Sequence, residues 1–216
     1  GVSAGRGRVR LPVRRRAALV GLLVGLSAAV KVVPVVAALP LARRHPWRVV
    51  VFAAATVLAV YAVPVALTGW DVVGYLPGYV HEQGYDNGDG FTIASILLPG
   101  KAAVVASVVA LVVIAVLQWR HTDPDDPWTA QLVGAGAMLL VVSSPYPWYS
   151  LVLVPSIALT GRSEWFVVPL LMTVHLLVPD AMPMPAAVLG SVAVVTTAWR
   201  RRRSPRPARP VAMVLT

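Results

Sequence analysis

The chain of 216 residues has no cysteine and little charge. Without cysteine, neither disulfide bonds nor thiolate metal sites are available. Charged residues make up 13% of the sequence and hydrophobic residues 57%, whereas a soluble domain carries about 25% charged residues. Phosphate-binding glycine loops are also missing, because neither GxGxxG after a strand nor a GK[ST] motif occurs. The sequence therefore predicts an integral membrane protein that needs no soluble nucleotide cofactor.

Long runs without charge divide the chain into membrane segments. A span needs about 20 consecutive apolar residues, and the polar, proline-rich string SSPYPWYS divides the longest run in two. About seven membrane segments are therefore predicted, and the fold class is an all-α polytopic transmembrane helical bundle. The runs are 17–42, interrupted by Lys31 alone, then 49–70, 102–119, 127–161, 165–179 and 181–199.

The basic residues lie at the ends of these segments, although the net charge is +10. From Val49 onward, one alternating set of connections holds eleven arginines, in 43–48, at 120, at 162 and in 200–209. The opposite set, 69–100, 143–149 and 179–185, holds no lysine or arginine. An excess of Lys and Arg marks the cytoplasmic side. Segments 69–100 and 143–149 are therefore expected to face outward from the cytoplasmic membrane, and nucleic acid is not an expected partner.

The first segment does not follow this rule, because arginines both precede and follow it. Either it spans the membrane with a basic outer end, or it is a re-entrant pair that breaks near Lys31 and Pro34. Backbone freed by such a break must be buried in protein or line a wet cavity. The predicted organisation is a basic lead over 1–16, a transmembrane domain over 17–199 with the outward loop 69–100, and a basic cytoplasmic tail over 200–216.

The outward loop carries four of the nine acidic residues, interleaved with aromatic rings. This composition suits a polyhydroxylated ligand, and a carboxylate can accept the proton of an attacking hydroxyl. Glu82 and Asp86 are the candidate catalytic residues, and His81, Tyr85 and Asp89 are candidate substrate-binding residues. A carboxylate pair could also hold a divalent cation, although no metal ligands are assigned. NGDG is also turn chemistry, so a purely structural role stays open for Asp89.

The string SSPYPWYS supplies three further candidate substrate-binding residues, Tyr146, Trp148 and Tyr149. Two prolines in this string predict a helix break that holds the rings at an outer membrane boundary. There the rings could stack on a sugar or flank a lipid tail. The alternative is the aromatic belt of an ordinary span. His175, in a later apolar run, is interpreted as a buried polar group of the bundle, with a proton carrier as the alternative.

Lys31 is the last candidate substrate-binding residue, because it interrupts an apolar run. A cation at membrane depth costs about 2.5–3.5 kcal/mol on insertion scales, so it predicts an anionic partner, here a phosphate. The alternative is that the side chain extends to the membrane interface.

Three strings together resemble the polyprenol-phosphate-sugar-dependent glycosyltransferases of the GT-C superfamily, especially the actinobacterial mannosyltransferases of glycosyltransferase family 87. They are GLLVGLSAAVKVVPVVAALPLARRHPWR, GYLPGYVHEQGYDNGDGF and SPYPWYSLVLVP. In this resemblance Lys31 matches the helix lysine, Glu82 and Asp86 match the acids of an outward loop, and the three rings of 146–149 match an aromatic motif.

The resemblance implies an α-helical enzyme that transfers a sugar, expected to be mannose, with inversion. The donor would be a polyprenyl-phosphate sugar, and the acceptor a glycolipid or glycan outside the membrane. Lys31 or a neighbouring cation would stabilise the leaving phosphate. The resemblance also places the base in an upstream loop with no counterpart here, so the chain is expected to be a C-terminal part. Glu82 and Asp86 would then order the acceptor or a cation.

Two other functions stay open. A transporter or channel would also place Lys31 and a broken helix beside a cavity. Apart from Lys31 and His175 the spans hold no ionisable group, which disfavours coupled ion transport. A non-catalytic membrane subunit would bind its partner through the Gly and Ala faces of its helices, although Gly21, Gly25, Gly134 and Gly136 are interpreted first as close-packing positions within the bundle.

Overall fold

The computed structural model describes residues 13–30, 35, 38–74 and 76–203. Within these ranges every regular element is a helix, which confirms the predicted all-α fold class. The helices are α1 (Val13–Val30), α3 (Leu39–Ala42), α4 (Pro46–Thr68), η1 (Trp70–Val73), α5 (Leu76–Glu82), α6 (Thr92–Leu97), α7 (Lys101–His121), α8 (Trp128–Val142), η2 (Pro147–Leu153), α9 (Val154–Thr160), η3 (Ser163–Phe166), α10 (Val167–Leu177) and α11 (Met184–Arg203).

Of the described helices, α4 and α7 are long and apolar enough to cross a membrane. Only 6% and 17% of their most apolar windows are buried inside the chain, so neither is the core helix of a soluble protein. Helices α8, η2–α9 and η3–α10 are apolar but shorter than a full span. The predicted number of about seven spans is therefore not confirmed.

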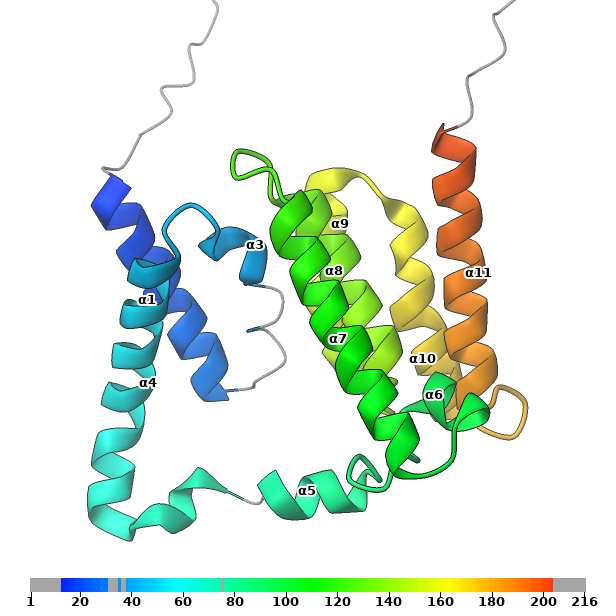
Figure 1. Cartoon of the computed structure of the whole chain (residues 1–216), viewed down its shortest axis with the longest axis horizontal. Helices are drawn as coiled ribbons and strands as arrows, with labels where there is room; N and C mark the ends of the chain where they lie inside the picture. The colour runs from blue at the N-terminus through cyan, green and yellow to red at the C-terminus, as the bar shows by residue number, and fades with distance from the viewer. Residues whose placement is uncertain (1–12, 31–34, 36–37, 75, 204–216) are drawn as a thin grey trace, which may run out of the picture.

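The helices run up and down between two ends of the molecule (Figure 1). The start of α1, the α3–α4 turn, the α7–α8 turn and the end of α11 lie at the upper end, which we call the basic end. Loop 69–100 and the segment after α8 lie at the opposite end, which we call the aromatic end. The two segments that the charge pattern assigned to one side are therefore found together.

The predicted outward loop stopped at Gly100, but α7 begins at Lys101. The aromatic end consequently carries Lys101, which the predicted loop 69–100 did not include. The cause is that the charge-free run was counted from Ala102, whereas the helix extends one residue further toward the loop.

Helix α1 packs along α4 through its two glycines. A Cβ at Gly21 would lie 2.5 Å from Cβ of Phe52, and one at Gly25 would lie 2.6 Å from the carbonyl oxygen of Ala53. The absence of side chains at these two positions, one helical turn apart, lets the backbones approach closely. This confirms the close-packing interpretation for this pair of glycines.

Lys31 and Pro34, near which a break was predicted as one alternative, lie outside the described residues. On either side of them, α1 begins at the basic end and α3 lies at the same end (Figure 1). Arg16 of α1 and Pro40 and Leu41 of α3 also line one cavity. The chain thus returns to the end from which α1 started, which favours the re-entrant alternative over a single crossing.

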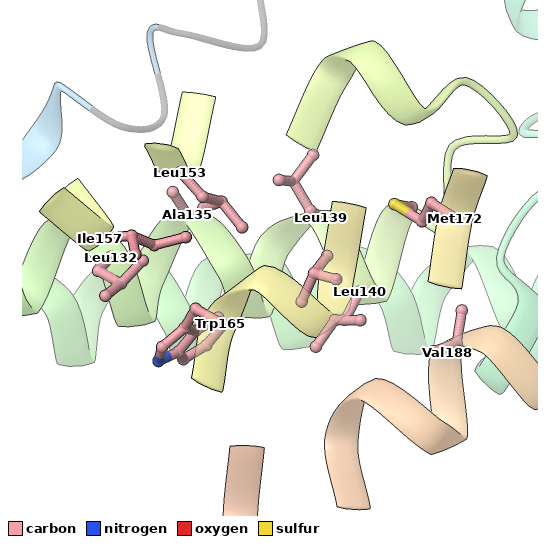
Figure 2. Close-up of a cluster of buried hydrophobic side chains, with 10 residues drawn as sticks. Leu132, Ala135, Leu139, Leu140, Leu153, Ile157, Trp165, Met172 and Val188 are labelled. Carbon is pink, nitrogen blue, oxygen red and sulfur yellow. The ribbon is translucent and has the colours of Figure 1, made fainter. Parts of the chain in front are cut away.

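The hydrophobic core lies among α8, η2–α9, η3–α10 and α11 (Figure 2). Its buried members are Leu132, Ala135, Leu139, Leu140, Leu153, Ile157, Trp165, Val168, Met172 and Val188. The ring of Trp165 lies directly against Gly136, where an added Cβ would be 1.9 Å from it. Gln118 of α7 lies against Gly134 in the same way. Both glycines are therefore packing positions, as predicted.

Candidate functional site

Three rings of the outward loop form one row at the aromatic end. Tyr79 is on α5, Tyr85 follows it in the turn, and Phe91 caps the start of α6. The ring centroids of Tyr79 and Tyr85 are 6.5 Å apart, and those of Tyr85 and Phe91 are 5.2 Å apart. Phe91 is buried. Phe91 therefore anchors the loop, whereas Tyr79 and Tyr85 are partly exposed.

Three rings of the string SSPYPWYS form a second row. Ser143 ends α8 with φ of 50°, a left-handed conformation that turns the chain sharply. Pro147 then starts η2, because its fixed φ suits a first helical position. The Tyr146 and Trp148 rings stack with centroids 4.6 Å apart, and Tyr149 lies 6.2 Å from Tyr146. Trp148 remains 47% exposed, so one face of this row is open to a ligand.

The two rows contact each other, although they are far apart in the sequence. The hydroxyls of Tyr79 and Tyr149 share a hydrogen bond. Tyr85 Oη donates to the carbonyl oxygen of Val142 at 3.4 Å. Burial raises the pKa of Tyr85 to about 12, and burial together with the Tyr149 hydrogen bond raises the pKa of Tyr79 further. We call these six residues the aromatic cluster: Tyr79, Tyr85, Phe91, Tyr146, Trp148 and Tyr149.

His81 and Asp86 form an ion pair on the surface beside the aromatic cluster. His81 Nδ1 lies 2.8 Å from Asp86 Oδ2. This hydrogen bond raises the pKa of His81 above its usual value and lowers the pKa of Asp86 below its own. The pair is the geometric consequence of α5 ending at Glu82, since the following turn brings position 86 back toward position 81. Two of the predicted site residues thus act as a unit.

Glu82 and Asp89 occupy different surroundings. Glu82 is the last residue of α5 and is exposed. The carboxylate of Asp89 accepts a hydrogen bond from Asn87 Nδ2 at 2.9 Å, and its backbone N–H donates to Asn87 Oδ1 at 3.0 Å. These bonds within the NGDG turn are the structural alternative considered for Asp89. In the described part of the chain, no three His, Asp or Glu side chains are placed to hold a metal ion together.

Lys101 is a candidate that sequence reasoning missed. The turn of the outward loop packs closely on the start of α7 at Gly88, whose φ is 98°. A Cβ at this position would lie only 2.4 Å from the carbonyl oxygen of Gly100. Helix α7 has no side-chain cap at this end, although the N–H groups of Ala102 and Ala103 donate to the carbonyl oxygens of Pro99 and Gly100. The positive end of the helix dipole and the charge of Lys101 both favour an anion here. The available signal was a lysine directly after a loop rich in carboxylates.

Two predicted residues lie apart from this site. Lys31 falls outside the described residues. His175, near the end of α10, contacts the carbonyl oxygen of Met182 through Nδ1 at 2.9 Å. Since a carbonyl only accepts, Nδ1 must carry the proton. His175 therefore ties α10 to the turn before α11, which agrees with its interpretation as a polar group of the bundle.

An apolar groove runs along α7, α8 and α11. Two adjoining cavities of about 570 and 490 Å³ share Ile114, Val133, Ala137 and Trp199. The second also reaches Ile93 on α6, close to Phe91. We call this the apolar groove. Its lining residues include Ile93 on α6 and Trp199 and Arg200 near the end of α11. Helix α6 lies at the aromatic end and the end of α11 at the basic end (Figure 1).

Comparison with known proteins gives one match. The family model described as Glycosyltransferase family 87 matches residues 7–145, more than half of the chain. The match includes α1 to α8 and the whole outward loop with Glu82 and Asp86, and it ends directly before Tyr146. Neither the curated proteins nor the solved structures gave a match.

Proposed function

Because the chain belongs to glycosyltransferase family 87, we propose that it is a multi-pass membrane enzyme that transfers mannose from a polyprenyl phosphate to a glycolipid or glycan acceptor. Transfer takes place at the aromatic end, on the outer face of the cytoplasmic membrane, with inversion at the sugar. Membership of the family makes the chain a glycosyltransferase; the donor, sugar, acceptor and stereochemistry are our proposal.

The observation that carries this proposal is the meeting of the outward loop with the string SSPYPWYS. The hydrogen bond between Tyr79 and Tyr149 joins the two segments. In the sequence of the outward loop, Glu82 lies three residues after Tyr79 and Asp86 directly follows Tyr85. Exposed rings such as Trp148 offer an apolar face to a sugar, and nearby carboxylates accept bonds from its hydroxyls. The α3–α4 turn and the end of α7, which carry Arg43, Arg44 and Arg120, lie at the opposite end (Figure 1), which supports an outward orientation of this site.

The reaction is a single displacement at the anomeric carbon. The acceptor hydroxyl oxygen forms a bond to that carbon from one face, while the bond to the phosphate oxygen breaks on the other. The hydroxyl proton passes to a carboxylate, and polyprenyl phosphate leaves. The resemblance implied a base in an upstream loop; among the carboxylates of this chain we assign the proton to Glu82. The hydrogen bond to His81 lowers the pKa of Asp86 and makes that carboxylate a weaker base. Asp86 and His81 then orient the acceptor.

The leaving phosphate needs a cation. Lys101 and the uncapped start of α7 supply one beside the outward loop, and a positive charge placed where negative charge develops lowers the barrier. Lys31 stays part of the proposal as a second cation. The apolar groove, whose lining includes Ile93, would receive the polyprenyl chain.

The test uses the full chain in proteoliposomes with radiolabelled polyprenyl-phosphate mannose. We expect Glu82→Gln to lower the transfer rate by about 100-fold or more, the usual contribution of a general base. Asp180→Asn is the matched control, because Asp180 is an exposed carboxylate outside the cluster, in the α10–α11 turn. Full activity of Glu82→Gln would remove Glu82 as the base. Transfer from a soluble nucleotide sugar instead would refute the donor, and no transfer from any donor would favour a non-catalytic subunit.

A further inference from the structure

A cavity of about 570 Å³ at the basic end lies apart from the aromatic cluster and the apolar groove. It is enclosed by α1, α3, the start of α4 and the turn between α7 and α8. Its polar lining comes from Arg16, Arg44 and His45. Its other lining residues are Ala17, Val20, Pro40, Leu41, Val49, Pro124, Pro127 and Trp128. We call it the basic cavity.

Two polar contacts hold the walls of the basic cavity together. Arg43 donates from a guanidinium nitrogen to the carbonyl oxygen of Thr122, and Arg44 forms an ion pair with Asp125. Both arginines lie in the α3–α4 turn, and both partners lie after α7. An exposed ion pair contributes little to stability, so its main effect is geometric: it brings the starts of α4 and α8 to one cavity.

Both of these helix starts face the cavity without a side-chain cap. His45 precedes α4 and Pro127 precedes α8, and neither makes a capping hydrogen bond. Both residues line the cavity. The first N–H groups of a helix have no partner within it, and the helix dipole makes this end positive. The charge of Arg44 is paired with Asp125, whereas Arg16 adds a full positive charge to the lining. Among the described residues, no carboxylate lines the cavity.

We propose that the basic cavity binds the headgroup phosphate of an anionic membrane phospholipid. Basic pockets between membrane helices on the cytoplasmic side are suited to such headgroups. The apolar lining from α1, α3 and α4 accommodates the first carbons of the acyl chains, which free phosphate could not use. Trp128 places an indole at the membrane interface, where this ring is favoured. The lipid would bridge the α1–α4 pair and the α7–α8 pair.

The proposal concerns the opposite end of the molecule from the transfer site and does not rest on the proposed reaction. The full chain is purified in an uncharged detergent and mixed with phosphatidylglycerol or with phosphatidylcholine. Bound lipid is measured by native mass spectrometry and the melting temperature by thermal scanning. We expect phosphatidylglycerol to be retained preferentially and to raise the melting temperature, because it binds only the folded state.

Substitutions identify the cavity as the place of binding. Arg16→Gln is expected to weaken phosphatidylglycerol binding about fivefold, the equivalent of about 1 kcal/mol for one surface cation. Arg16→Lys keeps the charge and should keep most of the binding. Arg48→Gln is the matched control. Arg48 is an exposed arginine in the first turn of α4, and it does not line the cavity. Val20→Trp should fill the apolar lining and displace the lipid without changing charge.

Three results would overturn the proposal. Equal retention of the two lipids would remove the role of the negative charge. An equal loss in Arg16→Gln and Arg48→Gln would indicate a general surface effect instead of a site. Full competition by millimolar inorganic phosphate, with unchanged lipid binding in Val20→Trp, would assign the cavity to a free anion.

Discussion

At the residue scale, the His81–Asp86 pair shows how one turn converts two sequence candidates into a unit. The charged pair exists where His81 is protonated and Asp86 is ionised. Because the pKa of His81 is raised, its contribution is fully present below the usual histidine pKa and is lost as the pH rises through the raised value. Because the pKa of Asp86 is lowered, the contribution of Asp86 is lost only as the pH falls below the usual carboxyl range.

This predicts a titration that NMR can follow in the full chain. The ring protons of His81 should titrate above the usual histidine pKa, and Asp86→Asn should return the midpoint to the usual value. Asp89→Asn is the control, because Asp89 bonds to Asn87 and not to His81. An unchanged His81 midpoint in Asp86→Asn would mean that the pair does not form in solution.

Lys101 permits a second prediction at this scale. Lys101→Met should lower the mannose transfer rate by about 100-fold, the loss typical of removing one group that stabilises developing charge. Lys101→Arg should retain a large part of the rate, since the charge remains. Steady-state kinetics in proteoliposomes separate the effects, because a loss confined to KM would assign Lys101 to donor binding only. Equal rates in both variants and the parent would exclude Lys101 from the reaction.

At the scale of elements, glycines decide how closely the helices approach. Gly136 gives the ring of Trp165 a flat surface on α8, and Trp165 is a member of the core shown in Figure 2. Gly21 and Gly25 do the same for α1 against α4. Close backbone approach replaces the hydrophobic effect as a source of association between helices in lipid.

Gly136→Ala should therefore destabilise the chain, because the added methyl group would overlap the Trp165 ring. Overpacking of this kind costs about 1–3 kcal/mol, and the melting temperature in detergent should fall. Gly190→Ala in α11 is the control, since its Cβ would meet only a flexible methyl of Leu171 at 3.0 Å. Equal melting temperatures for Gly136→Ala and the parent would contradict this packing.

At the scale of the whole molecule, the separation of the described arginines from the aromatic cluster is the basis of the proposed orientation. All of the arginines between Arg43 and Arg162 belong to turns or helix ends at the basic end (Figure 1). Both parts of the proposed transfer site lie at the other end. The two ends of the protein therefore differ in charge, and in a membrane the basic end is expected on the cytoplasmic side.

Cysteine labelling can test this direction, because the chain has no native cysteine and hence no background. Asn87→Cys and Trp148→Cys should react with a membrane-impermeant maleimide in intact cells. Asp125→Cys should react only after permeabilisation. Labelling of Asn87→Cys and Trp148→Cys from opposite sides would refute the shared site, and labelling of Asp125→Cys in intact cells would reverse the orientation.

The amino-acid sequence by itself determined the helical class, because this depends on apolar runs. It also predicted the side of each connection from the positions of the arginines, and this stays a prediction. The order of residues also predicted the packing glycines and the turn at Asn87–Gly90, since both are local properties. It could not predict that Tyr79 meets Tyr149, that His81 pairs with Asp86, or that Lys101 joins the same end.

Those contacts depend on how the chain folds back in space. The left-handed Ser143, the helix break at Pro147 and the turn after α5 set the directions that bring the two ring rows together. The basic cavity likewise depends on tertiary packing, because its walls come from segments far apart in the sequence that the Arg43 and Arg44 contacts connect. Distances between side chains far apart in sequence are properties of packing, so only the tertiary structure decided them.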